Sequence, residues 1–154
     1  MTTNKLERII KYNFNNVNLL KEALIHSSYS SRSCKKNKKN YERLEFLGDR
    51  VLGLVLAEYV FHVFPEANEG LLNSYYQKYV SQEYLFNYSK KIHLSNFIKT
   101  QKGDKLDDNK SILSDVVEAI IGAIYLDAGL TECKEFIINE IIGEVITSSK
   151  PFIF

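Results

Sequence analysis

The residues of this sequence that are best suited to chemistry are carboxylates that recur at short intervals. Glu42, Glu45 and Asp49 follow one another at spacings of three and four residues. On a helix, where successive residues are rotated by about 100°, these side chains share one face within an arc of about 60°. Like charges at this spacing repel one another by roughly a few tenths of a kcal/mol per pair. The face must therefore lie in water or be neutralised by a cation.

A second acidic pair has similar surroundings. Asp115 and Glu118 are three residues apart, and Gly122 continues the same helix face one turn later. The first group likewise has Gly48 and Gly53 within its own stretch. Glycine inside a helix costs about 1 kcal/mol relative to alanine, which suggests that something packs or binds very close. We expect the two glycine-bearing faces to oppose each other.

Opposed faces would bring four carboxylates into one cluster, namely Glu45, Asp49, Asp115 and Glu118. Crowded carboxylates are costly, or become protonated, unless a cation neutralises them. Hard oxygen ligands suit Mg²⁺ or Mn²⁺. A di-iron carboxylate bundle would need Glu-x-x-His pairs, and neither acidic stripe carries a histidine. The pattern favours Mg²⁺ and a reaction at phosphate oxygens.

Helices must hold these carboxylates in place. Helical periodicity dominates the chain, which has only seven glycines and two prolines, so we predict one all-α domain over residues 1–154. The acidic groups fall in helices predicted over Tyr41–Phe64, which Pro65 ends, and over Ser111–Leu126, which a glycine stop follows. A helix is also predicted over Asn4–Lys11, opened by a capping box of Asn4 and Glu7, and another over Val17–His26, capped by Asn16. Further helices are predicted from Glu69, with a cap or kink at Ser81, and over Thr131–Ile146, capped by Thr131. Between these two we predict an apolar turn at Leu94–Ile98 and a polar loop at Thr100–Asn109.

The overall composition excludes several classes of protein. Hydrophobic residues make up 45% and charged residues 25%, as in an ordinary globular domain. The two cysteines, Cys34 and Cys133, form neither a disulfide framework nor a zinc motif, so we expect a reducing, cytoplasmic setting. No signal-peptide core opens the chain, and no apolar run approaches the roughly 18 residues of a membrane span. The net charge of +1 indicates no partner.

A polar run, Ser30–Asn40, precedes the first acidic helix. Its cations are Arg32, Lys35, Lys36, Lys38 and Lys39. By composition the run is a solvated loop. By position it delivers its cations to the mouth of the acidic face, where they could bind a phosphate backbone. Both interpretations remain open.

Two further features have a structural and a functional interpretation. His26 lies at the end of a predicted helix, and we expect it to be a structural histidine with its hydrogen bonds made rather than a catalytic base. Aromatic residues are dense after Glu69 and could stack on bases, but at helical spacing we expect them in the core. These residues are Tyr75, Tyr76, Tyr79, Tyr84, Phe86 and Tyr88.

Four stretches of the sequence form a recognisable set. In chain order they are NVNLLKEALIHSSY, YERLEFLGDRVL, FPEANEGLL and KSILSDVVEAIIGAIYLDAG. With these stretches in this order, the sequence resembles ribonuclease III, whose signature is usually written (N)ERLEFLGDAVL. The resemblance extends from about Asn13 to the last predicted helix.

The resemblance implies the ribonuclease III endonuclease-domain fold, an all-α helical bundle that forms a homodimer. It implies an endoribonuclease that depends on Mg²⁺, with Mn²⁺ as a substitute. Two active sites would line a valley for double-stranded RNA, where a metal-activated water would leave 5′-phosphates, 3′-hydroxyls and short 3′ overhangs. RNA processing such as rRNA maturation is the expected role. The alternatives are a non-catalytic RNA-binding or ribosomal protein of this fold, which typically loses metal ligands, and a metal-carboxylate oxidase, which the missing histidines disfavour.

Carried over residue by residue, the resemblance implies four metal ligands, which are Glu45, Asp49, Asp115 and Glu118. Asp49 and Glu118 are also expected to be catalytic. Glu42 and Glu69 would be acids of the RNA valley that contact the substrate, although Glu69 could simply begin a surface helix. Phe46 would plug a socket of the dimer partner, with a place in the chain's own core as the alternative.

The sequence departs from the family pattern at several places. Tyr41 stands where asparagine is usual, and Arg50 stands where a small residue is usual. Arg50 could reach phosphate, pair with a carboxylate or touch the dimer partner, and the sequence does not choose among these. Ser74, Tyr75 and Tyr76 stand where the family has arginines. We expect no C-terminal double-stranded-RNA-binding domain within this chain.

Overall fold

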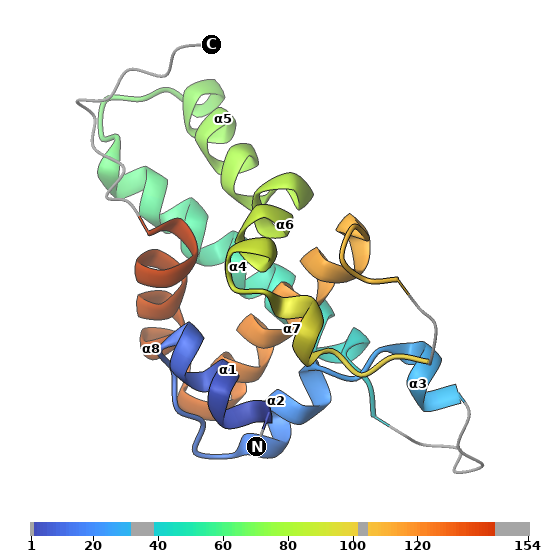
Figure 1. Cartoon of the computed structure of the whole chain (residues 1–154). Coiled ribbons are helices and arrows are strands. Elements are labelled where there is room, and N and C mark those ends of the chain that lie inside the picture. The colour runs from blue at the N-terminus through green and yellow to red at the C-terminus, as the bar shows by residue number, and fades with distance from the viewer. Residues whose placement is uncertain (1, 32–38, 102–104, 144–154) are drawn as a thin grey trace.

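The computed structural model describes residues 2–31, 39–101 and 105–143, and these ranges contain helices and no strand (Figure 1). The α-helices are α1 (Thr2–Ile10), α2 (Val17–Ala23), α3 (Ser27–Ser31), α4 (Glu42–Val63), α5 (Glu69–Val80), α6 (Gln82–Lys91), α7 (Lys110–Ala128) and α8 (Leu130–Phe136). Two further elements are the 3-10 helix η1 (Leu94–Phe97) and the π-helix η2 (Ile137–Ile142), which continues α8. The predicted all-α class is confirmed. Within the described ranges, no helix is long and apolar enough to span a membrane.

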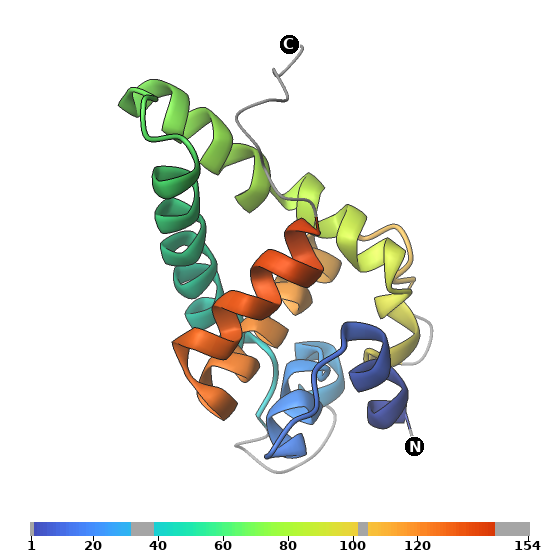
Figure 2. The ribbon, with the colours of Figure 1, turned by 90° about the vertical axis from the view of Figure 1, so that its left-hand side faces the viewer.

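Two helices, α4 and α7, form the centre of the molecule. Helix α7 contacts α2, α4, α6 and α8, and these neighbours surround it (Figures 1 and 2). Its side chains are buried over nearly the whole circumference between Leu113 and Ile124, which is typical of a helix enclosed on all sides. Figure 2 shows α5 and α6 following one another across the molecule from the far end of α4.

The closest approach between α4 and α7 depends on two glycines. A Cβ atom on Gly48 would lie 1.7 Å from the carbonyl oxygen of Glu118, and one on Gly122 would lie 2.2 Å from that of Leu44. Both distances are far shorter than van der Waals contact, so a larger residue would push the helices apart. The prediction that the two glycine-bearing faces oppose each other is confirmed at these positions.

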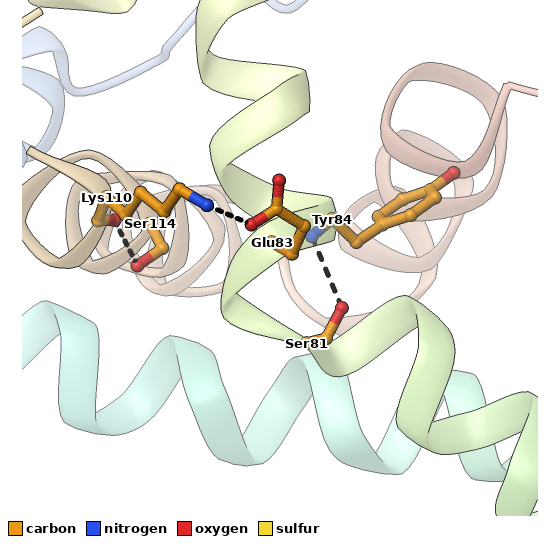
Figure 3. A network of polar contacts seen from close by, with 5 residues as sticks. All are labelled: Ser81, Glu83, Tyr84, Lys110 and Ser114. Carbon is orange, nitrogen blue, oxygen red and sulfur yellow. Dashed lines mark hydrogen bonds and ion pairs between the residues drawn. The ribbon is translucent and has the colours of Figure 1, made fainter. Parts of the chain in front are cut away.

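Four helices begin at a residue whose side chain caps the first turn. The capping residues are Asn16 (α2), Asn68 (α5), Ser81 (α6) and Asn109 (α7), and each accepts a hydrogen bond from a backbone N–H group of its helix. Figure 3 shows the cap at Ser81, whose hydroxyl accepts from the N–H of Tyr84 at 3.2 Å. Such caps satisfy backbone donors that a helix start leaves free. The predictions at Asn16 and Ser81 are confirmed.

The start of α1 differs from the prediction. The helix begins at Thr2, and the capping box predicted for Asn4 and Glu7 is wrong. The Glu7 carboxylate instead accepts a hydrogen bond from the backbone N–H of Phe14 at 2.9 Å, in the segment that follows the helix.

The segment around His26 is also organised differently from the prediction. Helix α2 ends at Ala23 because the next residues bond to a distant segment: the N–H of Lys99 donates to the Leu24 carbonyl at 2.8 Å, and the N–H of His26 donates to the Lys99 carbonyl at 2.9 Å. The short helix α3 that follows was not predicted, since its five residues carry no apolar periodicity.

Glycines flank the last helix on both sides. Helix α8 starts at Leu130, and Gly129 rather than the predicted Thr131 is its N-cap residue. The continuing π-helix stops at Ile142, after which Gly143 takes a left-handed φ of 65°. Such a residue commonly ends a helix. The predicted end at Ile146 lies outside the described residues.

Candidate metal centre

Three of the four predicted ligands lie together where α4 meets α7. One carboxylate oxygen each from Glu45, Asp115 and Glu118 lies within 4.8 Å of the other two, and all three side chains are half-buried. Glu45 comes from the first turn of α4, and the other two come from the first half of α7. The glycine contact places them there, because Gly48, one turn from Glu45, rests against the carbonyl of Glu118.

The three carboxyl groups repel one another. Burial raises the pKa of Glu118 to about 8, and the neighbouring charges of Asp49 and Asp115 add to the shift. Burial, and then the charge of Asp115, raise the pKa of Glu45. Burial also raises the pKa of Asp115. A divalent cation would relieve this repulsion, and a set of hard oxygen atoms fits Mg²⁺ or Mn²⁺.

Asp49, the fourth predicted ligand, lies beside this cluster. It is one turn beyond Glu45 on α4, and its charge contributes to the raised pKa of Glu118. Its carboxylate accepts a hydrogen bond from the guanidinium of Arg50, so Arg50 pairs with a carboxylate, one of the alternatives left open for it. The same guanidinium lies over Phe46, with its Cζ 4.6 Å from the ring centroid. Asp49 would bind a metal through its other carboxylate oxygen, or after releasing Arg50, since the pair involves only Oδ2.

Side chains that the sequence did not indicate pack around the cluster. Tyr41 is buried, and its ring stacks on that of His26 with 5.6 Å between centroids. Burial raises the pKa of Tyr41 to about 12, with the charge of Asp115 as the next cause. His26 Nδ1 accepts a hydrogen bond from the Ser28 backbone at 3.2 Å, which agrees with its expected structural role. The Ser111 hydroxyl donates to Asp115 at 3.4 Å, and its place four residues earlier on the helix is the signal that could have revealed it.

The two further acids predicted to contact substrate lie at opposite ends of α4. Glu42 is exposed at the first residue of α4, close to the cluster. Glu69 is exposed at the first residue of α5, beyond the far end of α4. Because α4 has 22 residues, it is about 33 Å long. The structure therefore does not bring Glu69 to the acidic cluster of its own chain.

Most of the basic run lies outside the described residues. Lys39 is exposed, and its Nζ lies 3.6 Å from a carboxylate oxygen of Glu22. Outside the described ranges lie the other cations of the run, which are Arg32, Lys35, Lys36 and Lys38. Their predicted contact with phosphate stays a prediction.

An apolar stripe on α4 faces away from the core. Phe46 is 64% exposed, Leu54 59% and Phe61 63%. At about 100° per residue these three side chains fall within an arc of about 80° on the helix. We call them the α4 stripe. The alternative that Phe46 belongs to the core of its own chain is wrong.

The raised pKa of Glu118 predicts how the stability of the metal-free protein changes with pH. Between pH 4.5 and about 8 the unfolded chain gives up this proton while the folded protein keeps it. The free energy of unfolding therefore falls as the pH rises through this window, by an amount on the order of a few kcal/mol. Urea unfolding in EDTA at pH 5 and at pH 8 measures the change.

Matched variants isolate this effect from other titrating groups. Glu118→Gln should reduce the loss of stability between the two pH values. Glu66→Gln, the same change at an exposed glutamate in the turn after α4, should leave it as in the wild type. Identical pH dependence in both variants would show that the Glu118 carboxyl group is not held protonated by its neighbours.

Comparison with known proteins finds relatives over most of the chain. Residues 16–145 match a family described as ribonuclease-III-like. Ribonuclease 3 of Ehrlichia ruminantium (strain Welgevonden) is 44% identical over 140 residues, which cover 89% of this chain and 61% of that protein. Ribonuclease 3 of Clostridium tetani is 40% identical over 153 residues, which cover 97% of this chain and 64% of that protein. The chain spans less than two thirds of the length of these curated relatives.

Solved structures share the fold. The nuclease domain of ribonuclease III from Campylobacter jejuni superposes with a TM-score of 0.82 at 39% identity, over 90% of this chain and 95% of that one. The same structure is described as having structural flexibility in a region involved in dimer formation. Dicer from Pichia stipitis superposes with a TM-score of 0.65 at 26% identity, over 85% of this chain and 55% of that one.

Proposed function

Because this chain belongs to the ribonuclease-III-like family, we propose that it is an endoribonuclease that uses Mg²⁺ to cleave double-stranded RNA. The observation that carries the proposal is the cluster of Glu45, Asp115 and Glu118, with Asp49 beside it. Cleavage would leave 5′-phosphates, 3′-hydroxyls and short 3′ overhangs. We place the enzyme in the cytoplasm, where it would process RNA such as rRNA precursors.

The four acids would hold the cation between α4 and α7. When bound, the cation supplies an activated water and neutralises charge on the phosphate. Ser111 orients Asp115 through its hydrogen bond. Tyr41, packed against His26, is buried close enough to the cluster that the charges of Asp115 and Glu45 act on its hydroxyl. Glu42 borders the open side, where the RNA would lie.

Incubation with a perfect RNA duplex tests this function. The chain should cleave the duplex in Mg²⁺ and leave it intact in EDTA, and it should not cut either single strand alone. The alternative, a non-catalytic RNA-binding protein, would bind the duplex and leave it intact in both conditions. Intact RNA in Mg²⁺, together with measurable binding, would therefore overturn the proposal.

We further propose that two copies associate through the α4 stripe. An exposed apolar face of this kind is typical of an interaction surface. Three large side chains contribute to it, and each is more than half exposed in the single chain. The related nuclease domain from Campylobacter jejuni has a region involved in dimer formation, which supports the same assembly here.

Phe46→Ala is expected to weaken the dimer by a few kcal/mol, roughly the effect of removing a buried aromatic anchor from an interface. Light scattering over a dilution series measures the dissociation constant. Leu71→Ala removes an exposed apolar side chain from α5, outside the stripe, and should leave the constant unchanged. A dimer of Phe46→Ala as tight as the wild type would place the interface elsewhere.

The basic run should contribute to RNA affinity without providing specificity. The variant in which alanine replaces all of Lys35, Lys36, Lys38 and Lys39 is expected to bind a duplex more weakly. The logarithm of its affinity should also fall less steeply with the logarithm of the salt concentration, since each lost phosphate contact lowers the magnitude of this slope by about one. Binding measured in EDTA over a range of salt concentrations gives both quantities. An unchanged slope would mean that the run is a solvated loop.

A further inference from the structure

Arg50 lies within the arc of the α4 stripe. Phe46, Arg50 and Leu54 follow one another at intervals of four residues on α4. At about 100° per residue, the Arg50 side chain therefore lies between the other two on the helix surface. Figure 2 shows α4, coloured teal to green, along one edge of the molecule. The Arg50 side chain is 62% exposed in the single chain, so association of two copies through the α4 stripe would cover it.

The guanidinium of Arg50 makes two contacts on its own helix. It donates a hydrogen bond to Oδ2 of Asp49, and its Cζ lies over the ring of Phe46, 4.6 Å from the centroid. Asp49 is a candidate metal ligand, and Phe46 is the predicted anchor of the dimer. One side chain thus connects the candidate metal centre with the proposed interface.

Burial in an interface would strengthen both contacts. In the single chain the pair of Arg50 and Asp49 is exposed to water and salt, which screen the attraction. A guanidinium that is removed from water needs a partner of opposite charge, because an unpaired buried charge is strongly unfavourable. An aromatic ring also attracts a cation more strongly once water is excluded. The dimer would therefore hold the Arg50 side chain, and with it the Asp49 carboxylate, more firmly than the single chain does.

A carboxylate held in this way is better prepared to bind a cation. The pair involves only Oδ2 of Asp49, which leaves Oδ1 for a metal. The Asp49 side chain is 46% exposed in the single chain. Such a side chain loses rotational freedom when it binds a cation, and a partner that orients it beforehand reduces that cost. Hydrogen-bonding partners of metal ligands typically contribute about 10–100-fold to metal affinity.

We propose that Arg50 is a positioning residue that couples association of two chains to metal binding: covered by the partner chain, it holds Asp49 through Oδ2 and presents the other oxygen to the cation. This inference rests on the proposed dimer and the proposed metal centre. Coupling between two binding events is reciprocal, so a bound metal must also tighten the dimer. A chain with a small residue at this position, which is the usual pattern of the family, would lack the coupling.

The dissociation constant of the dimer, measured by light scattering in EDTA and in saturating Mn²⁺, tests the proposal without RNA. Mn²⁺ should tighten the wild-type dimer at least about fivefold. Arg50→Ala should have the same dimer constant in both conditions, and should bind Mn²⁺ about tenfold more weakly by electron paramagnetic resonance. Arg8→Ala makes the same change at an exposed position on α1 and should behave as the wild type.

Arg50→Lys separates positioning from charge. Lysine keeps the positive charge but lacks the planar fork that donates to Asp49 while lying flat over the Phe46 ring. Its coupling should therefore be weaker than that of the wild type, and full coupling in Arg50→Lys would assign the effect to charge alone and contradict the positioning role.

Three outcomes would overturn the proposal. They are a wild-type dimer constant that is equal in EDTA and Mn²⁺, full coupling in Arg50→Ala, and a dimer that is looser in Mn²⁺, which would mean that the metal displaces Arg50 from Asp49. A dimer that binds Mn²⁺ without any coupling would contradict this inference alone and leave the proposed function standing. Absence of Mn²⁺ binding would contradict the proposed metal centre as well.

Discussion

Replacing Glu118 by glutamine is expected to lower the rate of duplex cleavage by roughly three orders of magnitude or more, which corresponds to about 4 kcal/mol of transition-state stabilisation. Glu118 lies within 4.8 Å of both Glu45 and Asp115 through its carboxylate oxygens. Glutamine keeps the size of the side chain but removes the charge that would hold a cation. Single-turnover cleavage of an end-labelled duplex at a fixed Mg²⁺ concentration measures the loss.

Two comparisons show whether this loss is specific to the metal centre. Glu66→Gln makes the same chemical change at an exposed position and should cleave at the wild-type rate. Glu118→Gln itself should form the same dimer and bind the duplex nearly as well as the wild type, because Glu118 is half-buried and glutamine keeps the size of its side chain. Persistent cleavage by Glu118→Gln at ordinary Mg²⁺ concentrations would contradict its assignment as a ligand.

Replacing Gly48 by alanine is expected to reduce the free energy of unfolding by about 4 kcal/mol or more, a large effect for one methyl group. The added Cβ would lie 1.7 Å from the carbonyl oxygen of Glu118 and 2.9 Å from the backbone nitrogen of Gly122. Both are backbone atoms of α7, so no side-chain rotation relieves the clash and the helices must separate. The same separation would pull Glu45 away from the acids of α7. Urea unfolding measures the loss of stability.

Two other glycines of the chain serve as matched controls. A Cβ on Gly70 would meet only the Asn68 side chain at 3.6 Å, which is ordinary contact, so Gly70→Ala should be nearly neutral. A Cβ on Gly53 would lie 2.9 Å from the hydroxyl of Tyr76, the far end of a side chain, so Gly53→Ala should cost less than Gly48→Ala. Equal stability of Gly48→Ala and Gly70→Ala would show that α4 and α7 do not depend on this close contact.

The two helices that carry the site are predictable because their signals are local. Periodic apolar residues, a proline after the first helix and a glycine after the second predict α4 and α7 to within a few residues of their bounds. The cost of glycine inside a helix also predicts a close contact, and Gly48 and Gly122 confirm it. This signal does not say which element makes the contact: Gly53, in the same helix, lies against Tyr76 of α5 and not against α7.

Side-chain partners within the site are less predictable because distant segments provide them. The start of α4 is tied to an earlier segment, where the N–H of Tyr41 donates to the Ile25 carbonyl at 3.0 Å and its ring stacks on His26. Spacing alone does not show that these residues meet. The sequence also left open whether Arg50 reaches phosphate, pairs with a carboxylate or touches the dimer partner, and the folded arrangement pairs it with Asp49.

Positions that depend on a second molecule are beyond what one sequence predicts. The exposure of Phe46 is visible on a helical wheel, and the structure confirms it at 64%. The socket that would receive this side chain belongs to a second copy, so the contact itself stays a prediction. Glu69 lies about one full length of α4 from the acidic cluster, so any RNA that touches both must extend across about 33 Å or contact two chains.

Titration with Mn²⁺, followed by electron paramagnetic resonance, tests most directly whether the acids of α4 and α7 form a divalent-metal centre. The wild-type chain should bind Mn²⁺ saturably, and Mg²⁺ should displace it. Glu118→Gln should bind at least about tenfold more weakly, whereas Glu66→Gln should bind as the wild type does. An absence of saturable binding in the wild type, or equal binding in Glu118→Gln, would contradict the account.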